Sequence, residues 1–390
     1  MRQLFKYGFT DALITMLTVV FWMYTSFLFN MEEYSNVYLV TYGFQFVFSV
    51  IYAILTRGTL KHEIMVNKRN HFINTSLYLQ TLLYVVIFGI SVFNLHSILD
   101  YYSLDYISYR YPYIYCLIYM ILDFIIASIK TVYQYQKNDK KAFKITVLYY
   151  LIRFSSVTIL KIIGVTSELA VAVSVILCFL LTLVFILKDF THLEKGFSLI
   201  QSIKYSLTTL PVYLLCCIIY LFGITDMTEA SELVLYTSSI FILCTDTLWD
   251  CANSAVSTRV SLDVDSGKFD IKKCVKDCLL FGVALSLIGV VILVIASFIV
   301  NLDIKYLIIF SILELTALTL SCVENAYREY ISLKYVSMKL FTANVVLETI
   351  KTVIVLSLTL VFKTHICTLV FTCTRLLLHY LTYKVKCKDT

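Results

Sequence analysis

Lys and Arg residues occur almost only in alternate gaps between apolar runs that are each about twenty residues long. A helix needs ~20 apolar residues to cross ~30 Å of hydrocarbon, and its backbone amides must be hydrogen-bonded within the segment. The runs therefore predict an all-α integral membrane protein with twelve transmembrane helices. The predicted spans are 8–29, 34–56, 74–98, 107–132, 145–164, 168–187, 205–223, 233–256, 279–299, 306–327, 340–362 and 364–383.

The distribution of positive charge predicts how these helices are oriented. The amino end, the even-numbered gaps and the carboxyl tail hold 25 of the 32 Lys and Arg residues, and cytoplasmic loops carry such an excess. Both termini are therefore expected in the cytoplasm, in a multi-pass protein of the cell membrane. With 59% hydrophobic residues, the chain has too little polar surface for a soluble globule. We interpret its net charge of +6 as a topology signal and not as a sign of nucleic-acid binding.

Short sequence matches half a chain apart predict an internal repeat of six helices. The matched segments are FKYGFTDAL (5–13) with IKYSLTTLP (203–211), LTRGTL (55–60) with STRVSL (257–262), and 133–144 with 327–339. Each pair falls at the same topological place in the two halves, as a parallel repeat requires. We expect an amino-terminal lobe at 1–190, a cytoplasmic linker at 191–200 and a carboxyl-terminal lobe at 201–390.

The loops and one proline carry a resemblance to a known family. In each half a long gap follows the second apolar run, at 57–70 and 259–276. A Tyr-rich outer segment at 99–115 leads into the fourth run, a basic turn at 133–144 follows it, and Pro211 lies early in the seventh run. In these features the chain resembles the multidrug and toxic compound extrusion (MATE) family, whose superfamily also holds lipid-linked oligosaccharide flippases. The resemblance implies two six-helix lobes around a central cavity and transport by alternating access.

The chain departs from that family where a recurrent acidic residue is expected on the first helix. The resemblance places this residue near 28–30, a segment that contains no carboxylate. Asp11 lies too early to match it. Asp11 and Glu324 are instead expected near the cytoplasmic interface, either solvated or paired with Lys6 and Arg328.

Charged residues within the predicted spans are the main candidates for a functional site, because an ionised group in the bilayer centre costs at least ~2.5 kcal/mol. Counted from the cytoplasmic ends, Asp123 and Arg153 lie at matched depth on consecutive helices, and so do Glu314 and Lys351. We therefore predict one acid and base pair in each lobe. The pairs are either structural clamps or coupling sites that exchange one partner for a proton or ion. The candidates among the charged residues of the spans are Asp11, Asp123, Arg153, Asp246, Asp250, Glu314, Glu324, Glu348, Lys351 and Arg375.

A polar face on the eighth predicted helix is a second candidate site. Asp246, Asp250 and Asn253 recur at i, i+4 and i+7 and therefore line one face. Neighbouring carboxylates favour a shared proton or a bound cation, so this face predicts a cation or proton site. The alternative is that both carboxylates bond to hydroxyl groups of adjacent helices. Asn344 and Glu348 form a similar pair on the eleventh predicted helix.

Motifs of nucleotide binding and hydrolysis, such as GxxxxGK[ST], HExxH and GxSxG, do not occur in the sequence. We therefore expect no enzyme activity, no cofactor beyond a coupling Na⁺ or H⁺, and no metal centre. The predicted function is secondary active export of amphipathic or cationic organic compounds by a monomer. The alternative is a flippase for a lipid-linked oligosaccharide or similar amphiphile, in which Arg153, Lys351 and Arg375 would hold a phosphate in the cavity.

Overall fold

A computed structural model provides the coordinates of the protein. The structure describes parts of 17–29 and 41–45, then 47–63, 73–136, 138–186, 197–206, 232–300, 304–334 and 366–386, with single positions at 210, 342, 346 and 350. Within these ranges some side chains lie outside the description, including those of 232–247, 250 and 314. All regular elements in the described ranges are helical.

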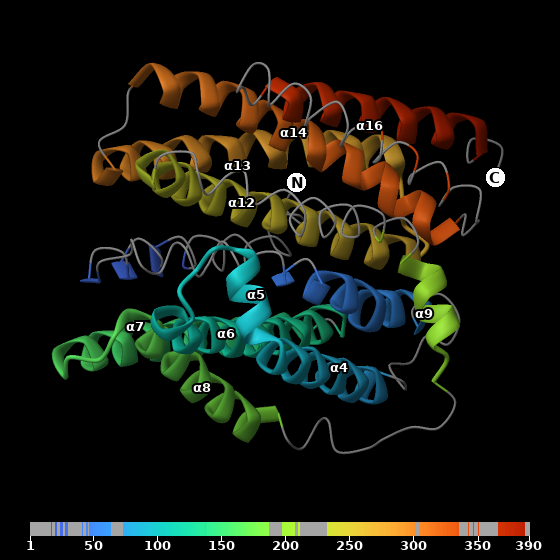
Figure 1. Ribbon diagram of the computed structural model, residues 1–390. Coiled ribbons are helices and arrows are strands. Elements are labelled where there is room, and N and C mark those ends of the chain that lie inside the picture. The colour runs from blue at the N-terminus through green and yellow to red at the C-terminus, as the bar shows by residue number, and fades with distance from the viewer. Residues whose placement is uncertain are drawn as a thin grey trace. The chain divides into compact units, whose positions relative to one another are not determined.

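Contacts group the chain into two units, one of residues 20–232 and one of residues 1–19 and 233–390, and each is described by itself. The predicted lobe boundary at 191–200 stays a prediction. The first unit contains η1 (Ala53–Gly58), α3 (Thr59–His62), α4 (Ile73–Phe93), α5 (Leu95–Tyr101), α6 (Tyr106–Tyr135), α7 (Asp139–Ile162), α8 (Ser167–Ile186) and α9 (Leu199–Ser206) (Figure 1). The second is built from α12 (Glu232–Asp265), α13 (Ile271–Val300), α14 (Ile304–Lys334) and α16 (Ile366–Lys386).

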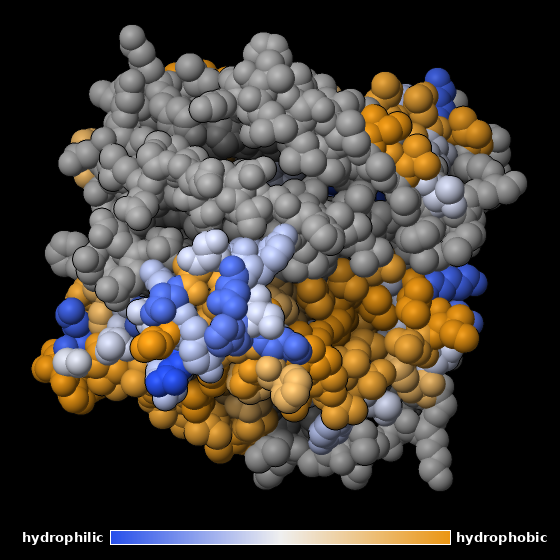
Figure 2. Space-filling model, in the orientation of Figure 1, coloured by the Kyte–Doolittle hydropathy of each residue, from blue (hydrophilic) through white to orange (hydrophobic). Residues whose placement is uncertain are grey.

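Five described helices are long and apolar enough to cross a membrane, namely Asn74–Phe93, Tyr106–Tyr135, Lys140–Ile162, Ser167–Val184 and Ile271–Ile295. Their outward positions carry large apolar side chains such as Leu82 and Ile90 on α4 and Leu287 on α13. Figure 2 shows that apolar residues cover much of the described surface on one face. A multi-pass helical membrane protein is therefore confirmed, whereas the total of twelve helices and the cytoplasmic position of both termini stay predictions.

The span predicted at 74–98 is divided into two helices at Asn94. The Asn94 side-chain Nδ2 donates to the backbone oxygen of Ile90 at 2.8 Å, and its backbone leaves the helical region with φ −99° and ψ 16°. Asn competes for backbone hydrogen bonds in this way. The long helix α4 therefore ends at Phe93, and the short α5 continues after it.

Helix α6 begins at an N-cap that the sequence provides directly. The Asp105 carboxylate accepts hydrogen bonds from the hydroxyl of Ser108 at 2.7 Å and from its backbone N–H at 2.8 Å. Both hydrogen bonds lower the pKa of Asp105, and the bond from the Ser108 hydroxyl has the larger effect. The cap satisfies a free amide of the first turn, and α6 then continues through Pro112 to Tyr135.

Small residues let α13 approach α14 closely. A Cβ atom on Gly282 would lie 2.8 Å from the Cα of Thr319, and one on Gly289 would lie 2.7 Å from a methyl of Leu315. Between them, the Ser286 hydroxyl donates to the Leu315 backbone oxygen at 2.7 Å. Such stripes of small residues are typical of membrane helix pairs, because they allow the close van der Waals packing that holds helices together in lipid.

Candidate functional site

A buried arginine lies at the centre of the first unit. Arg153 on α7 is 1% exposed, and its Nη1 donates to the hydroxyl of Tyr149, one turn earlier, at 2.9 Å. The Tyr149 hydroxyl donates in turn to Oδ1 of Asp123 on α6. The structure thus brings the predicted partners Asp123 and Arg153 together, and a tyrosine hydroxyl bridges them.

Aromatic rings surround the guanidinium of Arg153. Its central carbon lies 3.7 Å from the ring centroid of Phe21 and 5.1 Å from those of Tyr119 and Tyr149. A desolvated cation over a ring gains up to ~2 kcal/mol, and arginine does not lose its proton in proteins. Asp123, by contrast, is only half-buried, so it is less enclosed than Arg153.

The second unit holds a different charged cluster, in which one carboxylate faces three bases. Glu324 on α14 is 2% exposed, and its Oε1 lies 2.9 Å from Nδ1 of His379 and 3.4 Å from Nη2 of Arg375, both on α16. Its other oxygen lies 3.8 Å from Nη1 of Arg328. Of the two alternatives expected for Glu324, the structure shows the pairing with Arg328 and not solvation, because two α16 bases cover the carboxylate.

Of the polar face predicted on the eighth span, the structure describes the side chain of Asn253. Its Oδ1 accepts a hydrogen bond from Nδ2 of Asn325 on α14, whose amide also lies 3.5 Å from the hydroxyl of Ser321. The bond ties α12 to α14 on the face where Asp246 and Asp250 also lie by register. The side chains of these two aspartates lie outside the described residues.

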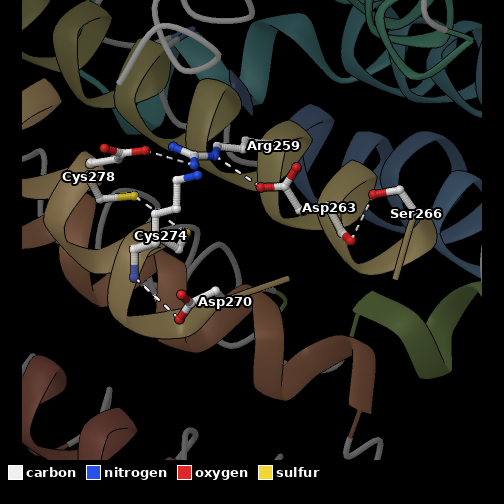
Figure 3. Close-up of polar contacts among 8 residues, drawn as sticks. Arg259, Asp263, Ser266, Asp270, Cys274 and Cys278 are labelled. Carbon is white, nitrogen blue, oxygen red and sulfur yellow. Dashed lines mark hydrogen bonds and ion pairs between the residues drawn. The ribbon is translucent and has the colours of Figure 1, made fainter. Parts of the chain in front are cut away.

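The two arginines of the repeated Thr-Arg motif have different partners. Arg259 on α12 donates from Nε to Asp263 at 3.1 Å and from Nη2 to Asp277 on α13 at 2.9 Å. Figure 3 shows this cluster at the start of α13, beside Cys274 and Cys278, whose sulfur atoms are 3.9 Å apart. The guanidinium of Arg57, by contrast, lies 5.3 Å from the ring centroid of Tyr52.

Helix α9 docks against η1 and α3 in the first unit. The hydroxyl groups of Thr59 and Ser202 are 2.9 Å apart, and a Cβ atom on Gly58 would overlap the backbone oxygen of Ser202. The rings of His62 and Tyr205 lie 5.6 Å apart. Burial, and then the Lys204 ammonium, lower the pKa of His62. Because of the overlap at Gly58, only glycine fits where the backbones of η1 and α9 meet.

Several predicted site residues cannot be placed by their side chains. The side chains of Glu314, Asn344, Glu348 and Lys351 lie outside the described residues. The acid and base pair of Glu314 and Lys351 therefore stays a prediction. Sequence reasoning missed Tyr149 and His379. Each is one helical turn from an arginine that it did select, and this i,i+4 spacing is the signal that could have identified them.

The comparisons with known proteins agree with this architecture. The sequence matches no protein-family profile and no curated relative. A mutant of the Vibrio cholerae MATE transporter VcmN matches the structure with a TM-score of 0.74 at 10% identity, over 100% of this chain and 97% of that one. The MATE multidrug transporter DinF-BH matches with a TM-score of 0.66 at 12% identity, over 99% and 95% of the two chains.

A eukaryotic MATE transporter, AtDTX14, matches with a TM-score of 0.61 at 12% identity, over 98% of this chain and 94% of the other. These likenesses extend over nearly the whole of each chain, although few residues are identical. The chain therefore has the MATE transporter fold, and the resemblance that the loops and Pro211 indicated is confirmed at the level of the fold.

Proposed function

We propose that the protein is a secondary active transporter that exports an amphipathic or cationic organic compound by alternating access, coupled to Na⁺ or H⁺. The proposal rests on the transporter fold and on one observation within it, the hydrogen-bond chain from Arg153 through Tyr149 to Asp123. In the proposed form the protein acts as a monomer, with both termini cytoplasmic and with no cofactor beyond the coupling ion.

The chain offers a specific means of coupling. Asp123 accepts a charge-assisted hydrogen bond from Tyr149, and such bonds contribute roughly 1.5–3 kcal/mol. A proton or Na⁺ on Asp123 would weaken this acceptor while Arg153 stays charged in its aromatic surroundings. Because about 1.4 kcal/mol changes an equilibrium tenfold, the loss of this one bond is enough to shift the balance between two lobe arrangements.

The test replaces Asp123 by Asn in cells that accumulate ethidium, an aromatic cation that fluoresces on nucleic acid. Wild type should lower the ethidium content of energised cells, and a protonophore or removal of Na⁺ should abolish the effect. Asp123→Asn should lose at least tenfold in efflux rate. Asp100→Asn is the matched control, because Asp100 is an exposed acid of the same unit paired with His96 at 2.8 Å. Full efflux by Asp123→Asn would rule out this coupling site.

A flippase for a lipid-linked saccharide or similar amphiphile is the second candidate. The excess of positive charge around Glu324 favours it, since Arg328 and Arg375 both face this single carboxylate. A vesicle assay separates the two functions. Transfer of a fluorescent polyprenyl diphosphate lipid between leaflets, measured by dithionite quenching, should be accelerated by a flippase, whereas an exporter of cations should leave it at the protein-free rate.

A further inference from the structure

One side of α13 changes from apolar to basic toward the amino end of the helix. Leu279, Val283 and Leu287 are exposed apolar residues, and their spacing places them on one side of α13. Lys272 and Lys276 continue this side at the same helical spacing and are also exposed. In a membrane the apolar side chains contact lipid chains, so the two lysines lie just beyond them on the side that faces the bilayer.

The apolar part of α13 has the length of the hydrocarbon layer. No charged residue occurs between Leu279 and Val300, a stretch that rises ~32 Å as a helix, and the hydrocarbon is ~30 Å thick. Lys276 lies ~4.5 Å beyond Leu279 along the axis, and Lys272 lies ~10 Å beyond it. Because the headgroups add roughly 5–8 Å on each side, Lys276 falls within the headgroup layer and Lys272 at its outer edge.

Four exposed lysines gather here, namely Lys268, Lys272, Lys273 and Lys276, and together they form the basic end of α13. Asp270 is the only exposed acid between 266 and 280. Its Oδ1 accepts hydrogen bonds from the backbone N–H groups of Lys272 at 3.0 Å and Lys273 at 3.4 Å, so this carboxylate caps the helix. None of the four ammonium groups pairs with an acid among the described residues, which leaves them available to an anion.

Buried contacts hold the backbone that carries these lysines. Arg259 on α12 donates to Asp263 at 3.1 Å and to Asp277, in the second turn of α13, at 2.9 Å (Figure 3). These two carboxylates are therefore occupied by the guanidinium. Phe269 stacks on Tyr330 of α14, with ring centroids 4.5 Å apart and planes 9° apart. A site that is fixed before its ligand arrives loses less conformational freedom on binding.

We propose that the basic end of α13 binds the phosphate group of an anionic phospholipid whose acyl chains lie along Leu279, Val283 and Leu287. Ammonium groups are common partners of phosphate, and basic clusters directly beyond a membrane helix recognise anionic lipids. The apolar side next to the lysines adds binding only for a molecule that has acyl chains, which favours a lipid over a soluble phosphate. The site lies in the second unit, separate from Asp123, and lipid binding there does not require transport.

Quenching of tryptophan by brominated lipid measures the occupant of this surface. The full-length chain carries Leu280→Trp as the reporter, with Trp22→Phe and Trp249→Phe to remove the two natural tryptophans. It is reconstituted into vesicles of phosphatidylcholine and phosphatidylglycerol in which one of the two lipids has brominated chains. The reporter should prefer phosphatidylglycerol at least about fivefold, and about 0.5 M salt should reduce this preference. Equal association of both lipids would overturn the proposal.

Replacement of the lysines tests whether the preference is local. Lys272→Gln/Lys273→Gln/Lys276→Gln should bring the reporter close to equal association of the two lipids. Arginine at the same three positions should retain the preference, because a guanidinium also binds phosphate. A preference that survives in the glutamine variant, or that is lost in the arginine variant, would contradict phosphate binding at this end of α13.

The matched control removes the same number of charges from the start of α7 in the first unit. Lys140→Gln/Lys141→Gln/Lys144→Gln should leave the preference at the α13 reporter unchanged. An equal loss in this variant would show that the lipid is attracted by overall charge and not by a local site. If the α13 triple variant does not insert into vesicles, Lys276→Gln alone, nearest to the apolar residues, should still lower the preference.

Excess inorganic phosphate at constant ionic strength distinguishes a lipid from a soluble anion. It has no acyl chains to place along α13, so it should leave the preference for phosphatidylglycerol unchanged. Loss of the preference under these conditions would identify a free phosphate as the ligand of the four lysines and would overturn the assignment to a lipid.

Discussion

The two copies of the Thr-Arg motif, at 56–60 and 258–262, use the same residues in different ways. In both copies the threonine and the leucine are buried, and both copies are helical, although the first begins in the π-helix η1 and the second lies within the α-helix α12. The third residue of the motif differs between the copies. Gly58 lies against the backbone of α9, whereas the Val260 side chain is buried in the core. The repeat therefore preserves the helix, and single residues within it determine what docks there.

The arginines of the two copies also differ in the contacts that they make. Arg259 pairs with Asp263 on its own helix and with Asp277 on α13, whereas Arg57 lies against the Tyr52 ring and donates from Nε to its hydroxyl at 3.4 Å. An ion pair that is shielded from water is costly to break on one side only. The second copy should therefore depend on its arginine far more than the first.

Replacement of each arginine by glutamine gives the largest expected difference. Arg259→Gln should lower the free energy of unfolding by about 3 kcal/mol, because it removes the shielded ion pairs that Arg259 makes with Asp263 and Asp277. Arg57→Gln should cost less, about 1 kcal/mol, the scale of a half-buried cation over a ring. Thermal unfolding of the two variants in the same detergent measures this, and equal losses would mean that the two sites are energetically alike.

Alanine at the third motif position should have the next largest effect. Gly58→Ala places a methyl group on the Ser202 backbone oxygen and should cost about 1–3 kcal/mol, with faster hydrogen exchange across α9. Val260→Ala is the matched control, which loses core packing but leaves α9 protected. Unchanged exchange in α9 for Gly58→Ala would refute the close approach of the two backbones.

The hydroxyl residues of the motif predict a smaller contrast. Thr59 bonds to Ser76 at 3.0 Å and to Ser202 at 2.9 Å, whereas the buried Ser261 hydroxyl has no partner among the described residues. Thr59→Val should therefore lose about 1 kcal/mol. Ser261→Ala should be neutral or slightly stabilising, because it removes an unsatisfied hydroxyl. A destabilised Ser261→Ala, measured by thermal unfolding, would contradict this account.

The docking of α9 should depend weakly on pH, which is the smallest effect expected. The pKa of His62 is lowered from its ordinary value of 6.5 by burial and then by Lys204, so the undocked histidine binds a proton more readily than the docked one. Docking is thus fully favoured above pH 6.5 and weakens as the pH falls below it. Exchange of α9 amides, corrected for intrinsic rates, should increase at pH 5 in wild type and less in His62→Gln.

The sequence predicted apolar helices and the proximity of Asp123 and Arg153. The physical reasons for these predictions also explain which contacts the sequence could not predict. Apolar length identifies a membrane helix without knowledge of its neighbours. The depth count brought Asp123 and Arg153 together because α6 and α7 are consecutive and joined by a short turn. Whether that pair is a clamp or a coupling site stays a prediction.

Contacts between distant helices could not be counted in this way. Glu324 and His379 lie on α14 and α16, with a further predicted span between them, and no depth argument orders helices that are not consecutive. The docking of α9 on Gly58 was equally hidden. The repeat match identified the position of Gly58, but only the structure shows that the α9 backbone meets it.

Coupled transport through Asp123 can be measured as ethidium flux in proteoliposomes under imposed gradients. Purified wild type should move ethidium against its gradient when a pH or Na⁺ gradient is present, and should stop when an ionophore dissipates that gradient. Asp123→Asn should lose at least tenfold of this uphill movement, whereas Asp100→Asn should keep it. Uphill movement that is equally fast in Asp123→Asn, or wild-type flux that ignores both gradients, would contradict the account.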